Sequence, residues 1–204
     1  MTDSIEALER LRAGNTRFVA NELSLPKPDV ERARLASGQT PFAVILGCSD
    51  SRVPTEIVFD QGLGDLFVIR VAGNIVAPSQ IGSIEFAAQK FGTRLVVVLG
   101  HTNCGAVEAT IDELRRPPEK QSRNIAAIVG RIRPSVVDLL ESGEIGDHDE
   151  LVRRAVRDNV RFSANALRHG SDIIEDLIGS GELLVVGAEY SLDTGVVEFF
   201  DGTP

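Results

Sequence analysis

Apolar residues in this chain gather in short unbroken runs, and longer segments with helical spacing separate these runs. Four runs have the length and continuous apolar character of strands that are buried on both faces of a sheet: 42–46, 66–71, 95–99 and 183–188. A fifth run, 196–200, follows the turn residues Asp193, Thr194 and Gly195, which predicts an antiparallel edge strand.

Helical periodicity fills most of the remaining chain. Residues 83–91 place apolar side chains on one helical face between the second and third runs, so strand, helix and strand predict a parallel crossover. We therefore predict an α/β fold: one domain over residues 1–204, with a central, mostly parallel sheet of about four parallel strands plus the antiparallel edge strand, flanked by helices. An N-terminal helical arm is expected at 1–38, and the α/β core at 39–204.

Composition and charge narrow the class of protein. The chain has 204 residues, 43% of them hydrophobic and 25% charged, which is ordinary globular usage. The net charge of −9 repels phosphate backbones and anionic lipid surfaces, so we expect neither a nucleic acid nor a membrane as partner. Residues 1–12 lack the apolar stretch of a secretory signal, and no run approaches a membrane span; a cytoplasmic location is predicted.

Residues whose side chains could bind a metal or catalyse a reaction follow two of the apolar runs. Cys48-Ser49-Asp50-Ser51-Arg52 comes after the first run and His101-Thr102-Asn103-Cys104-Gly105 after the third, in a chain with only two cysteines and three histidines. The carboxyl ends of neighbouring parallel strands meet at one edge of a sheet, so the two segments can converge. Cys48, His101 and Cys104 are predicted to bind one zinc ion (Zn2+) per chain, since cytoplasmic cysteines favour metal ligation over a disulfide.

Three protein ligands leave a fourth zinc position for water, which distinguishes a catalytic zinc from a structural one. Zinc lowers the pKa of bound water, so hydroxide becomes available near neutral pH. Asp50 is the candidate base or hydrogen-bond acceptor, and the planar guanidinium of Arg52 can hold it bidentately, away from the metal. If Arg52 releases Asp50, the carboxylate is expected to become the fourth zinc ligand, a conditional role that gives a closed state of the site.

These two strings, together with the intervening segments 65–70 and Ala72-Gly73-Asn74, resemble the β-class carbonic anhydrases. The resemblance implies reversible hydration of carbon dioxide to bicarbonate and a proton by a zinc-bound hydroxide. It also implies that Cys48, His101 and Cys104 are the metal ligands and that Asp50 and Arg52 form the catalytic dyad.

Similarity to the plant-like subclass of that family implies a substrate pocket that contains Gln39 and Phe67, which match the subclass. Ala72 and Phe86 stand where that subclass often has Val and Tyr, which predicts a slightly altered pocket, and Gly105 is assigned to the same pocket. In the family, the counterparts of Gln39 and Phe67 reach the zinc of the neighbouring subunit. A homodimer or a dimer of dimers is therefore implied.

Two alternatives stay open from the residues alone. Hydrolysis of carbon disulfide or carbonyl sulfide needs the same zinc chemistry on the same scaffold. A non-catalytic zinc protein, either structural or bicarbonate-sensing, would use Asp50 to close the site. Arg70, considered alone, is interpreted as a structural ion-pair partner, with an anion site as the alternative.

Overall fold

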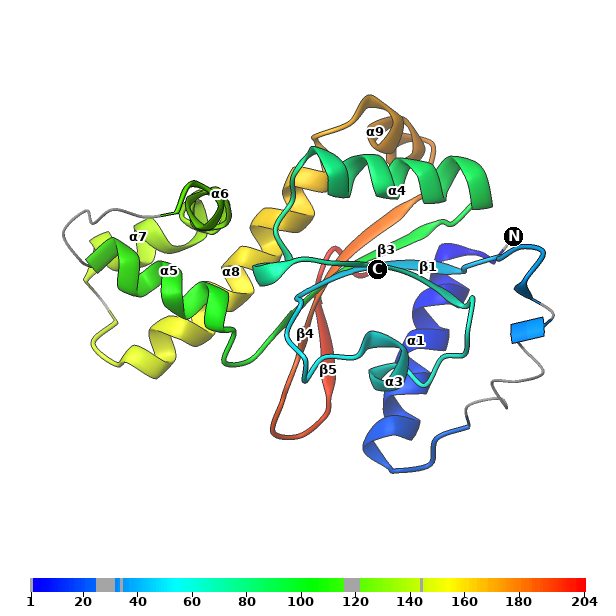
Figure 1. The fold of residues 1–204 in the computed structure, drawn as a ribbon, viewed down its shortest axis with the longest axis horizontal. Helices are drawn as coiled ribbons and strands as arrows, with labels where there is room; N and C mark the ends of the chain where they lie inside the picture. Colours follow the sequence, from blue (N-terminus) through cyan, green and yellow to red (C-terminus); the bar gives the residue numbers. More distant parts are fainter. Residues whose placement is uncertain (1, 25–31, 34, 116–121, 144) are drawn as a thin grey trace.

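The computed structural model describes residues 2–24, 32–33, 35–115, 122–143 and 145–204 (Figure 1). Its sheet has the order β2-β1-β3-β4-β5, in which the first four strands are parallel and β5 is antiparallel to β4. The strands are β1 (Ala43–Gly47), β2 (Leu66–Arg70), β3 (Leu95–His101), β4 (Leu184–Tyr190) and β5 (Val197–Asp201). The predicted fold class is confirmed, including the antiparallel edge strand.

Helices cover both faces of the sheet, and further helices form a lobe to one side (Figure 1). One face carries α1 (Ser4–Val19) and α3 (Thr55–Val58), and the other carries α4 (Pro78–Phe91), α8 (His148–Arg168) and α9 (Asp172–Gly179). The lobe contains α5 (Gly105–Arg115), α6 (Arg123–Ile132) and α7 (Pro134–Ser142). None of the helices in the described part of the chain has the length and hydropathy of a membrane span.

The continuous apolar runs form strands because both faces of the sheet are buried. In β1, Ala43 and Ile45 belong to the core cluster under α1, whereas Val44 and Leu46 belong to the cluster under α4 and α8. Strand β1 pairs with β2 on one side and β3 on the other. The chain runs from β1 to β2 on one side of the sheet and from β3 to β4 on the other side. The direction of strand addition therefore reverses between β1 and β3. Ligand sites in open α/β sheets lie at this switch point.

Strand β3 extends two residues beyond the predicted end at residue 99. Gly100 and His101 continue the ladder with β4, opposite Glu189 and Tyr190. Gly100 also allows α8 to pack directly on the strand, because a Cβ at this position would meet Val160. The candidate ligand His101 is therefore fixed by strand pairing and does not lie in a loop.

Helix α1 packs on the core of its own chain. Leu8 and Leu11 are fully buried in the cluster on this face of the sheet. The Asn15 side chain donates to Val58 O (3.2 Å) and Gly195 O (2.9 Å), and it accepts from Val197 N at 2.8 Å. The predicted N-terminal arm thus begins with a helix that hydrogen-bonds to two distant parts of the fold.

Two helical glycines test this docking of α1. At Gly14 a Cβ would collide with the Phe59 carbonyl oxygen, whereas at Gly130 in α6 it would meet nothing within 4 Å. We expect Gly14→Ala to lower the free energy of unfolding by about 1–3 kcal/mol through overpacking. Gly130→Ala should raise it by roughly 0.5–1 kcal/mol through helix propensity. Urea unfolding measures both, and an unchanged Gly14→Ala variant would contradict the close packing of α1.

Candidate metal centre

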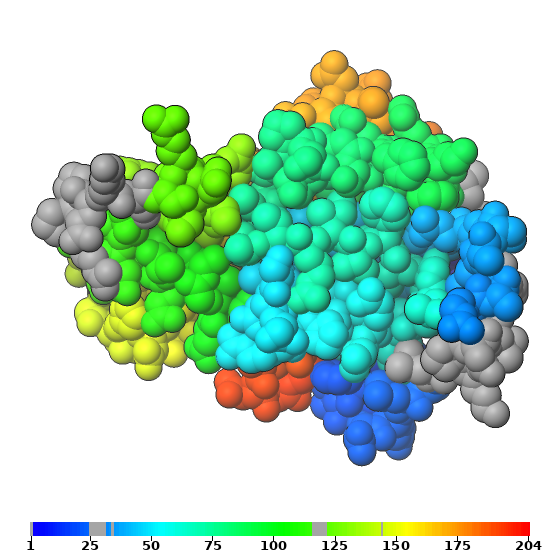
Figure 2. Space-filling view, viewed as in Figure 1, coloured from blue at the N-terminus to red at the C-terminus, as the bar shows by residue number. Residues whose placement is uncertain are grey.

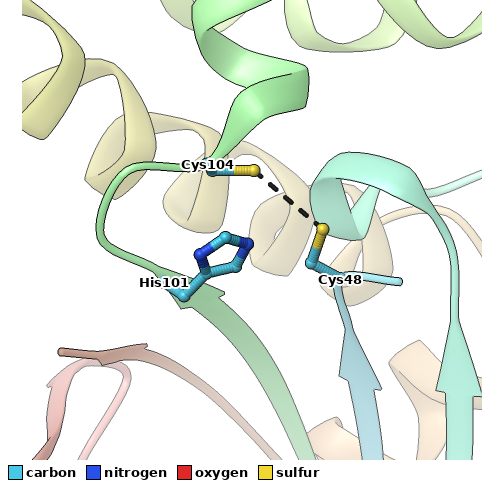
Figure 3. A group of neighbouring side chains, drawn as sticks. All are labelled: Cys48, His101 and Cys104. Atoms are coloured by element: carbon cyan, nitrogen blue, oxygen red, sulfur yellow. Dashed lines mark hydrogen bonds between the residues drawn. The ribbon is translucent and has the colours of Figure 1, made fainter. Parts of the chain in front are cut away.

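Three side chains converge at the carboxyl ends of β1 and β3. Cys48 follows β1, His101 ends β3, and Cys104 precedes α5; all three are buried and point toward one another (Figure 3). Their ligand atoms all lie within 4.8 Å of one another. This convergence is possible because β1 and β3 are direct neighbours in the sheet.

The two sulfur atoms have the spacing of metal ligands. Both cysteines are free thiols, with 4.0 Å between the Sγ atoms. A disulfide needs about 2.05 Å, whereas a tetrahedral zinc with Zn–S bonds of about 2.3 Å separates two sulfurs by about 3.8 Å. The observed distance is close to the second value.

The imidazole of His101 is oriented for metal binding. Its Nδ1 lies 2.9 Å from the Thr102 carbonyl oxygen, so Nδ1 carries the hydrogen and donates it. Nε2 then presents a lone pair; it is buried and has no hydrogen-bond partner among the described residues. An unpaired buried nitrogen costs about 1–3 kcal/mol, and a metal ion removes that cost. Two thiols and this nitrogen suit zinc.

Thr102 was not singled out by sequence reasoning, although it lies inside the His-Thr-Asn-Cys string. Its backbone N–H donates to Tyr190 O at 3.0 Å, and its Oγ1 accepts from Leu192 N at 3.0 Å. The carbonyl that orients the His101 imidazole is thereby fixed to the end of β4. Hydrogen bonding of this kind from behind a ligand sets its tautomer and orientation.

The ligand atoms influence one another electrostatically. A hydrogen bond from the Cys104 thiol lowers the pKa of Cys48 to about 4 against the opposing effect of burial, and the Gly73 amide contributes at 3.3 Å. The pKa of Cys104 is raised because its proton is shared with Cys48 and because it is buried. Burial lowers the pKa of His101, but the neighbouring Cys48 sulfur and the Thr102 carbonyl raise it overall. The trio thus holds one thiolate readily.

Asp50 and Arg52 form a bidentate pair beside the trio. Arg52 Nε donates to Asp50 Oδ1 at 2.9 Å, and its terminal nitrogen donates to Oδ2 at 2.7 Å. These bonds hold the pKa of Asp50 well below its usual range. Asp50 Oδ2 lies 3.8 Å from His101 Nε2, so the carboxylate faces the trio. The same Arg52 nitrogen reaches Asn103 O at 3.4 Å and links the two ligand segments.

The contacts of Arg70 differ from those predicted from the sequence. This residue was expected to be an ion-pair partner, but among the described residues it has no carboxylate partner. Its Nε instead donates to Cys48 O at 3.1 Å and its terminal nitrogen to Asp50 O at 2.6 Å. The reason is its position at the end of β2, opposite Gly47, where the guanidinium reaches the loop that follows β1.

The five predicted substrate residues fall into two groups. Ala72 and Gly105 are next to the trio: Ala72 precedes Gly73, whose amide contacts Cys48, and Gly105 follows Cys104. Phe67 and Phe86 lie elsewhere.

Phe67 and Phe86 belong to an aromatic cluster with Phe91 on the α4 side of β2, with ring centroids 5.6–6.3 Å apart. Gln39 is exposed and lines a surface hollow of about 610 Å³ with Leu63 and other neighbours. A single chain therefore does not bring these three side chains to its own trio.

Comparisons with known proteins agree with this geometry. A carbonic anhydrase family model matches residues 43–197. Carbonic anhydrase 2 of Mycobacterium tuberculosis is 41% identical over 195 residues, which cover 95% of this chain and 91% of the relative.

Two solved β-carbonic anhydrases share the fold. The Aspergillus fumigatus enzyme CafA superposes with a TM-score of 0.75 at 26% identity, covering 99% of this chain and 93% of that one. Tetrameric enzymes from Sordaria macrospora give a TM-score of 0.74 at 25% identity, covering 83% and 85%. The fold, the buried Cys-His-Cys trio and these matches lead to one conclusion: the chain belongs to the β-carbonic anhydrase family.

Proposed function

We propose that this chain catalyses the reversible hydration of carbon dioxide to bicarbonate and a proton, with one zinc ion held by Cys48, His101 and Cys104. The observation that carries the proposal is the Asp50–Arg52 pair. Both Asp50 oxygens are occupied by Arg52, so the carboxylate faces the trio without joining it. The trio therefore supplies three ligands and leaves a fourth position for chemistry, as a catalytic zinc site requires.

When bound, zinc lowers the pKa of a water molecule in the open position, which makes hydroxide available near neutral pH. The chain's own residues orient the reacting groups. Asp50 remains ionised across the neutral range because of Arg52, so its carboxylate accepts hydrogen bonds and orients an O–H donor beside the trio. A carboxylate with so low a pKa is a weak base, which favours a role in orientation over one in proton storage.

Stopped-flow carbon dioxide hydration from about pH 6.5 to about pH 9 tests the function on protein of known zinc content. We expect one zinc per chain and strong turnover by about pH 7.5, because Asp50 stays with Arg52. Activity confined to pH values above about 8 would contradict the open arrangement. Full zinc with no turnover at any pH would indicate a non-catalytic protein, and turnover of carbonyl sulfide or carbon disulfide alone would indicate the alternative hydrolase.

The role of Asp50 is tested by Asp50→Asn. We expect the variant to retain its zinc and to lose roughly 10²–10⁴-fold in kcat/KM near neutral pH, since the fixed anionic acceptor is gone. Asp60→Asn is a matched control, because Asp60 is also paired with an arginine, Arg17, but lies between α1 and α3. The control should unfold more easily and keep its kcat/KM. Loss of zinc from Asp50→Asn would show that Asp50 is mainly a ligand.

We also propose that two chains form a homodimer, alone or within a dimer of dimers, in which Gln39, Phe67 and Phe86 of one chain complete the pocket of the other. Strand β2 is an edge of the sheet, and Phe86 beside it is 52% exposed. Figure 2 shows a broad face formed by the segments around β2 and α4. Association of two chains through this face is consistent with the tetrameric Sordaria macrospora relatives.

Replacing Phe86 by aspartate tests this interface. We expect Phe86→Asp to be monomeric in sedimentation velocity and to lose most activity, because a charge at the centre of an apolar contact disrupts association. Phe162→Asp on α8 is the matched control, since Phe162 is 42% exposed. It should keep the wild-type mass and turnover. A dimeric, active Phe86→Asp variant would place the interface elsewhere.

The location of the protein is proposed to be the cytoplasm. Free thiols as metal ligands suit a reducing compartment, where disulfides are rare. Both cysteines of the chain are free in the structure and belong to the trio.

A further inference from the structure

Asn159, on α8, is a buried amide behind the metal centre that the proposed reaction does not use. The residue is only 1% exposed, and its Nδ2 donates to the Gly73 carbonyl oxygen at 2.8 Å. The backbone N–H of Gly73 in turn donates to Cys48 Sγ at 3.3 Å. Two hydrogen bonds, joined through the backbone of Gly73, therefore link α8 to one sulfur of the trio.

The segment between them, η1 (Ala72–Asn74), is a tight turn that no strand pairing holds. Gly73 and Asn74 have φ values of 69° and 43°, so two consecutive residues lie in the left-handed region. A Cβ on Gly73 would lie 2.7 Å from Ile132 Cδ1 and 3.2 Å from Ala106 Cβ. The turn is thus confined by α5 and α6, while the polar bond from Asn159 fixes its carbonyl.

Asn159 is a costly residue for this position. Its helix neighbours Ala155, Val156 and Val160 are buried apolar side chains, and within the described part of the chain Asn159 Oδ1 has no hydrogen-bond partner. A buried, unpaired polar oxygen costs about 1–3 kcal/mol. An apolar side chain of the same shape would avoid this cost, so packing alone does not account for the asparagine.

We propose that Asn159 is a positioning residue of the metal centre. By holding the Gly73 carbonyl it aims the Gly73 amide at Cys48 Sγ, which fixes the sulfur's direction and stabilises its negative charge. The inference rests on the proposed zinc site. Loss of hydrogen bonds behind a ligand costs about 10–100-fold in metal affinity in comparable sites.

Asn15 provides a matched control on the opposite face of the sheet. It is also a buried asparagine whose amide donates to backbone carbonyls, but its partners are Val58 and Gly195. Replacing either asparagine by leucine preserves the shape of the side chain and removes its hydrogen bonds. Comparing the two substitutions therefore distinguishes a general loss of stability from a loss of ligand positioning.

The first measurement is zinc affinity, by competition with a chromophoric chelator, on purified full-length protein. Asn159→Leu should raise the zinc dissociation constant about 10–100-fold, and Asn159→Ala should do the same. Asn15→Leu should lower the midpoint of thermal unfolding and leave the zinc dissociation constant unchanged. Equal zinc affinity in wild type and both Asn159 variants would overturn the proposal.

The second measurement is the absorption spectrum of the cobalt(II)-substituted protein. Without Asn159 the Gly73 amide is no longer aimed at Cys48 Sγ, and a thiolate that loses an N–H donor has a sulfur lone pair of higher energy. The sulfur-to-cobalt band of Asn159→Leu should therefore move to longer wavelength. Asn15→Leu should show the wild-type band. An unmoved band in both Asn159 variants would reduce Asn159 to a structural role. A wild-type protein that takes up no zinc or cobalt would overturn the metal site itself, a distinct outcome.

Discussion

The parallel pairing of β1 with β3 is the constraint on which the rest of the molecule depends. Their register places Gly47 opposite Leu99, so the residues that follow each strand emerge side by side at the switch point of the sheet. Cys48 and His101 are neighbours for this reason, although more than fifty residues separate them in sequence. Pairing of β3 with β4 continues through His101 and so carries the order of the sheet into the site.

Backbone groups perform most of the positioning around the trio. The Thr102 carbonyl sets the His101 tautomer, the Gly73 amide contacts Cys48 Sγ, and Arg70 binds the carbonyls of Cys48 and Asp50. Main-chain groups have no rotamers to lose, so a site held by them costs little side-chain entropy. It also inherits the rigidity of the elements behind it, here the end of β4, the edge strand β2 and helix α8.

The sequence was informative where a signal is local. Continuous apolar runs predict strands buried on both faces, and two short strings contain all of the candidate ligands and the Asp50–Arg52 pair. Contacts that depend on distant neighbours could not be predicted. Arg70 was misinterpreted because carbonyl acceptors carry no sequence signature, and β3 is longer than predicted because Gly100 and His101 pair with β4. In the sequence, Asn159 is recognisable only as an amide residue among apolar residues with helical spacing.

The site combines a buried trio with a more exposed ion pair, Asp50–Arg52. His101 is fully buried, while the Asp50 side chain is 17% exposed and that of Arg52 is 54% exposed. Exposed ion pairs contribute only about 0–1 kcal/mol to stability, so the orientation of Asp50 depends on directed hydrogen bonds. Arg52 donates two bonds from its guanidinium and one from its backbone N–H to the carboxylate. A further bond, from the Arg52 guanidinium to Asn103 O at 3.4 Å, joins this pair to the segment that carries His101 and Cys104. The same guanidinium therefore contacts both Asp50 and the segment that supplies two members of the trio.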